Sequence, residues 1–178
     1  MSVGIVAARY AKSLIELAKE QNVVEAVYED MKLFKDTVDK NRGLMLALKS
    51  PVVRHEKKLA ILKALFLERV NSASYAIFTI ITKKNRESIL DAIADEFIKA
   101  YDSYRGIQKA VIITTTPLTE ELRAQFNKIV ADSTGKTVEL EEKIDPSLIG
   151  GYLLRVNDQQ VDASLRSKLN ELKLQLAS

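Results

Sequence analysis

Apolar side chains recur at spacings of three and four along the first hundred residues, which is the period of an amphipathic helix. Val24, Val27 and Met31 illustrate the spacing. The pattern stops at Ser50-Pro51, because proline restricts the residue before it, and at Arg105-Gly106, because glycine commonly follows a helix end. It predicts six helices, within residues 1–20, 22–40, 44–48, 54–67, 71–83 and 85–104. Their short connections favour a helical bundle.

The pattern changes after Gly106. Residues 110–117 are rich in β-branched side chains and end at a proline, which is typical of a strand. Thr119 is a suitable N-cap for a helix that ends at Gly135. Further elements are predicted as strands at 137–141 and 152–156, a turn at Asn157-Asp158, and a last helix that opens at Asp162 or Ser164. We therefore predict an α+β protein, with a six-helix bundle at 1–105 and a small C-terminal α/β domain at 106–178.

Two predicted helices carry more apolar surface than a surface helix needs. On a helical wheel, apolar residues of the first helix cover about 200°, against a usual stripe of about 100°. The helix at 71–83 has no charged residue before Lys83. Such helices either lie at the centre of a bundle or line a groove for an amphipathic helix of another protein. The candidate groove residues are Ala7, Ala8, Ala11, Leu14, Ile15, Ala73, Ile77, Ile80 and Ile81.

The last helix shows a narrower apolar face. Leu165, Leu169, Leu172 and Leu176 span only about 60° of the wheel, so we expect this seam to pack on the adjacent sheet. Leu174 points to the far side and is a candidate for a second partner contact.

The composition provides few groups for catalysis. The 178 residues contain one histidine and no cysteine, which excludes a disulfide framework, a thiolate nucleophile and a multi-histidine metal cage. His55 lies in a charged run, where a lone histidine is usually solvated. Gly150-Gly151 precedes a strand instead of joining a strand to a helix, so it does not form a phosphate-binding turn. We expect neither a metal nor a cofactor.

Three aspartates cluster around the predicted turns. Asp145, Asp158 and Asp162 normally serve as caps in such positions, and their spacing matches no metal or acid–base site. A small enzyme built around Asp145 to Asp162 is one alternative function.

Charge gives a second alternative, a nucleic-acid-binding helical module. Residues 1–105 carry 18 basic and 14 acidic side chains, and residues 106–178 carry 9 and 10, for a net charge of +3. Acidic residues are mixed among the basic ones along the same helices, which argues against a binding face for a polyanion. The longest charge-free stretch, Val70 to Thr82, is shorter than a membrane span, and the N-terminus has no leader pattern, so we expect a cytosolic chain.

The order and spacing of several short motifs resemble the delta subunit family of F-type ATP synthase, called oligomycin sensitivity-conferring protein in mitochondria. The most specific motif is the run from Asp145 to Tyr152, which is followed by Val161-Asp162-Ala163-Ser164. The others are Ala8-Arg9-Tyr10-Ala11, Pro51-Val52-Val53 with Lys57, Asn85-Arg86, and Thr114 with Pro117-Leu118.

The resemblance implies a non-catalytic stator subunit that holds the catalytic head against the torque of the rotor. It implies that the N-terminal domain binds N-terminal helices of alpha subunits in a groove between the first and fifth helices. It also implies that the C-terminal domain binds the b subunits of the peripheral stalk. Such a chain has no small-molecule substrate and lies at the cytoplasmic face of the cell membrane, attached only through the complex.

Overall fold

The computed structural model describes residues 3–156 and 159–177, apart from the side chains of residues 174, 176 and 177. The chain forms two compact units, Met1–Tyr101 and Asp102–Ser178, which meet within a helix close to the expected domain boundary. Each unit has its own apolar core.

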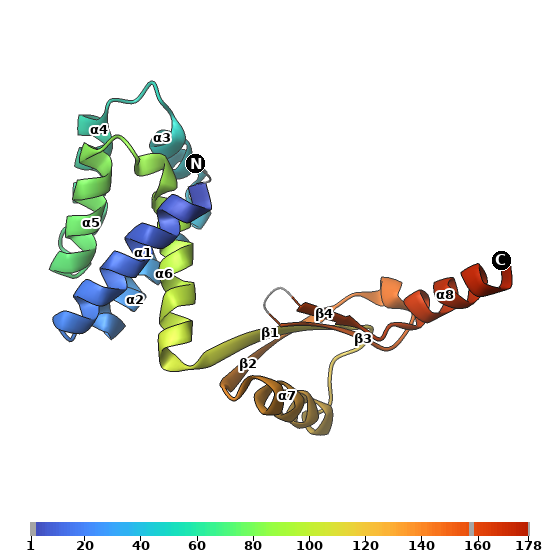
Figure 1. The fold of residues 1–178 in the computed structure, drawn as a ribbon. Coiled ribbons are helices and arrows are strands. Elements are labelled where there is room, and N and C mark those ends of the chain that lie inside the picture. Colours follow the sequence, from blue (N-terminus) through green and yellow to red (C-terminus); the bar gives the residue numbers. More distant parts are fainter. Residues whose placement is uncertain (1–2, 157–158, 178) are drawn as a thin grey trace. The chain divides into compact units, whose positions relative to one another are not determined.

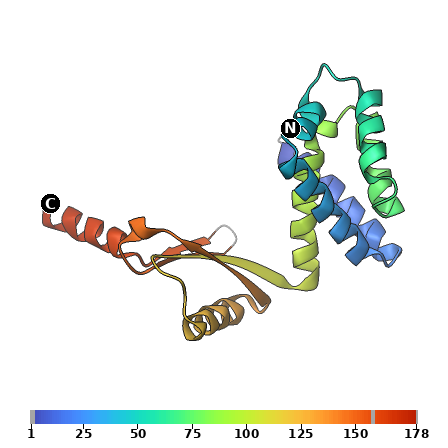
Figure 2. The ribbon, with the colours of Figure 1, turned by 180° about the vertical axis from the view of Figure 1, so that it is seen from behind.

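The first unit is the helical bundle (Figures 1 and 2). Its helices are α1 (Val3–Glu20), α2 (Val24–Lys40), α3 (Arg42–Lys49), α4 (His55–Phe66), α5 (Ser72–Lys83) and α6 (Leu90–Arg105), and a 3₁₀ turn, η1 (Glu87–Ile89), precedes α6. The prediction of six helices is confirmed. Asn41 and Asn71 cap α3 and α5, where their side chains accept hydrogen bonds from the N–H groups of Leu44 and Ala73.

The apolar helix faces meet in one core. At its centre Phe34, Phe66 and Phe78 pack against one another, with ring centroids 4.9–5.7 Å apart. Tyr28 of α2 stacks on Tyr101 of α6 at 3.8 Å. Tilted and stacked rings of this kind add to the stability that burial of the rings supplies.

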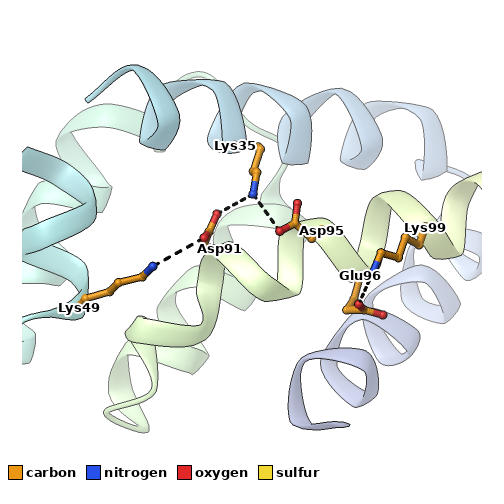
Figure 3. A network of polar contacts seen from close by, with 6 residues as sticks. All are labelled: Lys35, Lys49, Asp91, Asp95, Glu96 and Lys99. Carbon is orange, nitrogen blue, oxygen red and sulfur yellow. Dashed lines mark hydrogen bonds and ion pairs between the residues drawn. The ribbon is translucent and has the colours of Figure 1, made fainter. Parts of the chain in front are cut away.

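A charged network joins three of the helices (Figure 3). Lys35 Nζ of α2 lies 3.0 Å from Asp91 Oδ1 and 2.8 Å from Asp95 Oδ2 of α6, and Lys49 Nζ of α3 lies 4.0 Å from Asp91 Oδ2. Burial lowers the pKa of Lys35, but the hydrogen bonds to Asp95 and Asp91 outweigh it, so that pKa is raised overall. These partly exposed ion pairs therefore connect α2, α3 and α6 at the surface of the bundle.

The second unit contains a four-stranded sheet in the order β2-β1-β3-β4. Its elements are β1 (Ile107–Thr114), α7 (Glu120–Thr134), β2 (Thr137–Ile144), the 3₁₀ turn η2 (Pro146–Leu148), β3 (Tyr152–Val156), β4 (Gln159–Asp162) and α8 (Leu165–Ala177). β1 and β2 are parallel, whereas β3 runs antiparallel to both β1 and β4. β4 was not predicted, because Gln-Gln-Val-Asp has little strand propensity and is ordered by its pairing with β3. The predicted turn at Asn157-Asp158 lies outside the described residues.

Helix α7 covers one face of this sheet. Phe126 and Val130 of α7 pack on Ala110, Ile112 and Leu154 of the central strands. The predicted helix ends are confirmed: the Thr119 hydroxyl accepts from the N–H of Leu122, and Gly135 has a φ of +65°.

The C-terminal helix corrects one prediction. We expected its leucine seam to pack on the sheet, but Leu165, Leu169 and Leu172 are 47%, 56% and 53% exposed, and α8 extends away from the sheet (Figures 1 and 2). α7 already covers the sheet face that carries the small core, and the other face includes charged residues such as Lys109 and Arg155. That face also carries the half-buried Val111, Ile113 and Leu153, so it is mixed in character, and the described leucines of α8 stay exposed beside it.

Candidate partner-binding surfaces

Most of the predicted groove residues belong to the core of the bundle. Their exposed fractions are 6% or less, and the set comprises Ala7, Ala11, Leu14, Ile15, Ala73 and Ile81. Small side chains at Ala7 and Ala11 allow α1 to pack closely on its neighbours, which include α5 and α2. The wide apolar arc is thus used largely inside the protein, where these six side chains are buried.

The remaining predicted groove residues lie at the surface. Ala8 is exposed, Ile80 is 45% exposed, and Ile77 is half-buried. Sequence reasoning missed Val3 and Ile5, which are 55% and 54% exposed on α1. On the helical wheel Ile5 lies among the polar residues of the first helix. This placement could have shown that its apolar side chain faces outward.

A cavity of about 550 Å³ lies between the start of α1 and the turn that follows α5. Figures 1 and 2 show the N-terminal end of α1 beside the start of α6. The lining residues are Val3, Val6, Arg9, Tyr10, Asn85, Arg86, Ser88 and Ile89. Arg86 Nη1 donates a hydrogen bond to the Tyr10 hydroxyl at 3.3 Å, which holds the turn against α1.

This cavity is positively charged. Arg9 and Arg86 are both exposed, and no acidic side chain is among the described residues that line it. Within the described parts of the chain, neither guanidinium group forms an ion pair. The sequence analysis quoted both arginines within family motifs but not as partner-binding residues, because positions 9 and 86 come to one cavity only through the packing of α1 beside the α5–α6 turn.

Two apolar surfaces lie among the described residues of the C-terminal unit. One is the leucine seam of α8, which we define as Leu165, Leu169 and Leu172. The other is a cavity of about 500 Å³ beside α7, which is lined by residues that include Leu118, Leu122, Phe126, Ile129 and Tyr152. The side chain of Leu174, the predicted contact of this unit, lies outside the described residues.

Two of the three aspartates of the alternative small enzyme, Asp145 and Asp162, act as caps, whereas Asp158 lies outside the described residues. Asp145 Oδ1 accepts from the N–H of Ser147 at 2.9 Å, and Asp162 accepts from the N–H of Ser164 at 2.9 Å and from Ser167 Oγ at 2.7 Å. Hydrogen bonds from Ser147 lower the pKa of Asp145, and those from Ser164 and Ser167 lower the pKa of Asp162. The predicted capping role is confirmed for Asp145 and Asp162.

Other groups in the described chain suggest no catalytic centre. His55 is exposed at the first position of α4. The described residues contain no cluster of three or more histidine, aspartate or glutamate side chains that could hold a metal ion.

Comparison with known proteins identifies the family. The family profile described as "ATP synthase delta (OSCP) subunit" matches residues 6–176. The chain belongs to this family. ATP synthase subunit delta of Cytophaga hutchinsonii is 42% identical over 94% of this chain and 92% of its own, and that of Flavobacterium psychrophilum is 34% identical over the full length of both. A chain in the Toxoplasma gondii mitochondrial ATP synthase hexamer has the same fold, with a TM-score of 0.74 and 22% identity over 97% of each chain.

Membership of the delta family decides between the functional alternatives. The chain is a non-catalytic stator subunit of an F-type ATP synthase, and neither the nucleic-acid-binding module nor the small enzyme is supported. Among the described residues, no helix is long and apolar enough to cross a membrane.

Proposed function

We propose that this delta-family chain joins the catalytic head to the peripheral stalk through two separate surfaces. The N-terminal unit binds N-terminal helices of alpha subunits at the outer surface of α1 and α5. The C-terminal unit binds the b subunits along α8. In this role the chain is a peripheral subunit at the cytoplasmic face of the cell membrane, attached through the complex.

The exposed leucine seam of α8 carries this proposal. Leu165, Leu169 and Leu172 are spaced by four and three residues, so they lie on one side of the helix, and each is about half exposed. A helix from a partner can pack against such a stripe and bury it. Removing apolar surface from water stabilises an assembly by about 25 cal/mol per Å².

The α1–α5 surface is supported by fewer residues than the sequence suggested. Ala8, Ile77 and Ile80 retain surface for a partner, whereas the other predicted groove residues stabilise the bundle itself. Ion pairs of Lys35 with Asp91 and Asp95 join α2 to α6. Helices held together in this way suit a stator, which must resist torque.

The α8 assignment is tested by measuring the affinity of the full chain for a C-terminal segment of the b subunit. The double variant Leu169→Ser/Leu172→Ser should weaken binding at least about tenfold, because each leucine contributes to the buried area. Lys168→Ser on the same helix is the matched control and should bind as the wild type does. Wild-type affinity of the folded double variant would reject α8 as the stalk-binding element.

The α1–α5 assignment is tested with a peptide of the alpha-subunit N-terminal helix. Ile80→Asp should weaken its binding, since it places a charge on the exposed surface of α5. Leu46→Asp is the control, because Leu46 is 59% exposed on α3 and the change is chemically the same. Circular dichroism must show both variants folded, and equal peptide affinities for the two would contradict the assignment.

A further inference from the structure

The cavity at the start of α1 combines two features that no assigned role explains. Arg9 and Arg86 bring two guanidinium groups to its lining, and Val3, Val6 and Ile89 supply apolar walls. The cavity adjoins the end of α5, so it continues the α1–α5 surface at one end.

Arg86 is held in place by its backbone. Asn85 has a φ of +54°, the N–H of Asn85 donates to the carbonyl of Thr82, and the N–H of Arg86 donates to the carbonyl of Ile81. These two hydrogen bonds form a Schellman motif that terminates α5, with asparagine in the left-handed position. The motif and the Tyr10 hydrogen bond together position the Arg86 side chain before any partner arrives.

The described lining of this cavity carries positive charge only, and the nearby Glu87 is buried and paired with Lys58. Lys83 and Lys84 immediately precede Asn85-Arg86, and the cavity has no acidic side chain among its described lining residues. Arginine binds carboxylates through paired N–H donors, and this geometry favours a planar carboxylate. The apolar walls favour a carboxylate carried on an amphipathic helix over a free, fully hydrated anion.

We propose that Arg9 and Arg86 bind an acidic side chain of the partner helix that lies on the α1–α5 surface, and so set the position of that helix along this surface. The proposal rests on the binding of alpha-subunit helices by the N-terminal unit. An apolar groove alone permits a helix to shift by one turn, whereas one ion-paired residue at its end selects a single register.

The probe is a synthetic peptide of the alpha-subunit N-terminal helix from the same organism, together with versions in which each acidic residue is replaced by its amide. Binding to the full chain is measured by calorimetry at low and high salt. Arg86→Gln and Arg9→Gln should each weaken binding of the unmodified peptide about tenfold at low salt, because a charged hydrogen bond is lost. The loss should shrink at high salt.

Arg69→Gln is the matched control, since Arg69 is exposed near the end of α4 and does not line the cavity. One amide peptide should bind the wild-type chain as weakly as the unmodified peptide binds the Arg86→Gln variant. The affinity of that amide peptide should fall little further when it is measured with the Arg86→Gln variant. Thermal unfolding should show all variants as stable as the wild type.

Two results would overturn the inference, and they are distinguishable. If the unmodified peptide binds the wild-type chain and both arginine variants equally well, the carboxylate contact is wrong while the alpha-binding role stands. If the unmodified peptide does not bind the wild-type chain, the alpha-binding role itself is wrong and the carboxylate contact falls with it.

Discussion

The side chain of Lys58 shows how strongly the fold can change the environment of a single residue. It follows Arg54, Glu56 and Lys57 in a run of charges, yet it is only 2% exposed. Its Nζ donates to the carbonyl of Leu48 at 2.9 Å and to the carboxylate of Glu87. A buried charge is tolerated only with such partners, so Lys58 ties α3, α4 and η1 together.

Breaking this pair from one side should be costly. Lys58→Met should lower the free energy of unfolding by about 3–5 kcal/mol, because Glu87 would remain buried without a counter-charge. Adding Glu87→Gln should recover part of the loss. Denaturant unfolding followed by circular dichroism measures both changes.

The exposed pair of Lys40 and Asp36 provides the comparison, since their side chains are 79% and 67% exposed. Lys40→Met should cost less than about 1 kcal/mol. A Lys58→Met/Glu87→Gln protein no more stable than Lys58→Met would contradict the account of the buried pair.

Gly151 is a second position where the backbone dictates the residue. Its φ is +78°, and a Cβ there would lie 2.3 Å from the carbonyl oxygen of Ala163. Gly135 has a similar φ of +65°, but a Cβ there would meet nothing within 4 Å. A side chain at Gly135 would therefore cause backbone strain alone, whereas a side chain at Gly151 would cause both backbone strain and a steric clash.

Gly135→Ala should cost about 1–2 kcal/mol through the left-handed conformation alone. Gly151→Ala should cost about 1–3 kcal/mol more, because the segment before α8 must move away. Equal losses in denaturant unfolding would show that Ala163 relaxes without cost.

At the scale of elements, the periodicity predicted the helices well and the short strand poorly. β4 has four residues and forms because β3 offers it a partner, so its existence depends on pairing more than on its own sequence. Caps were more predictable, since an aspartate two residues before a serine at the start of a helical turn is a local signal. Asp145 and Asp162 cap the segments that lead to β3 and α8.

These caps predict a dependence of stability on pH. Both carboxyl groups have a pKa below the ordinary value of 3.8 in the folded chain, so the unfolded chain takes up protons first as the pH falls. Their contribution is complete above pH 3.8 and is lost as the pH falls below that value.

Asp145→Asn/Asp162→Asn should therefore flatten the acid side of the stability curve relative to the wild type. Thermal unfolding over a series of acidic pH values measures this effect. The exposed Asp132→Asn is the control, and an equal flattening by that variant would contradict the role of the caps.

At the scale of the whole molecule, the chain builds two separate cores of unequal size. The core of the first unit includes Phe34, Phe66, Phe78 and Phe97, whereas that of the second has Phe126 and four smaller buried residues. A small core supplies less hydrophobic stabilisation, so the second unit should be the less stable.

Calorimetry of the full chain should therefore show two unfolding transitions. Phe126→Ala should lower only the earlier transition, and Phe97→Ala only the later one, each by about 3–5 kcal/mol in stability. A single transition that both variants lower equally would show that the two units unfold as one.

The sequence by itself determined the α+β class, the six helices, the change of pattern at Gly106 and the capping roles of Asp145 and Asp162. These properties follow from local periodicity, helix-end residues and composition, which act over a few neighbouring positions. Only the tertiary structure decided which apolar residues are free for a partner. It placed Ala11 and Ile81 in the core, left the leucine seam of α8 exposed, and brought Arg9 beside Arg86, because burial and long-range contacts depend on which helix packs against which.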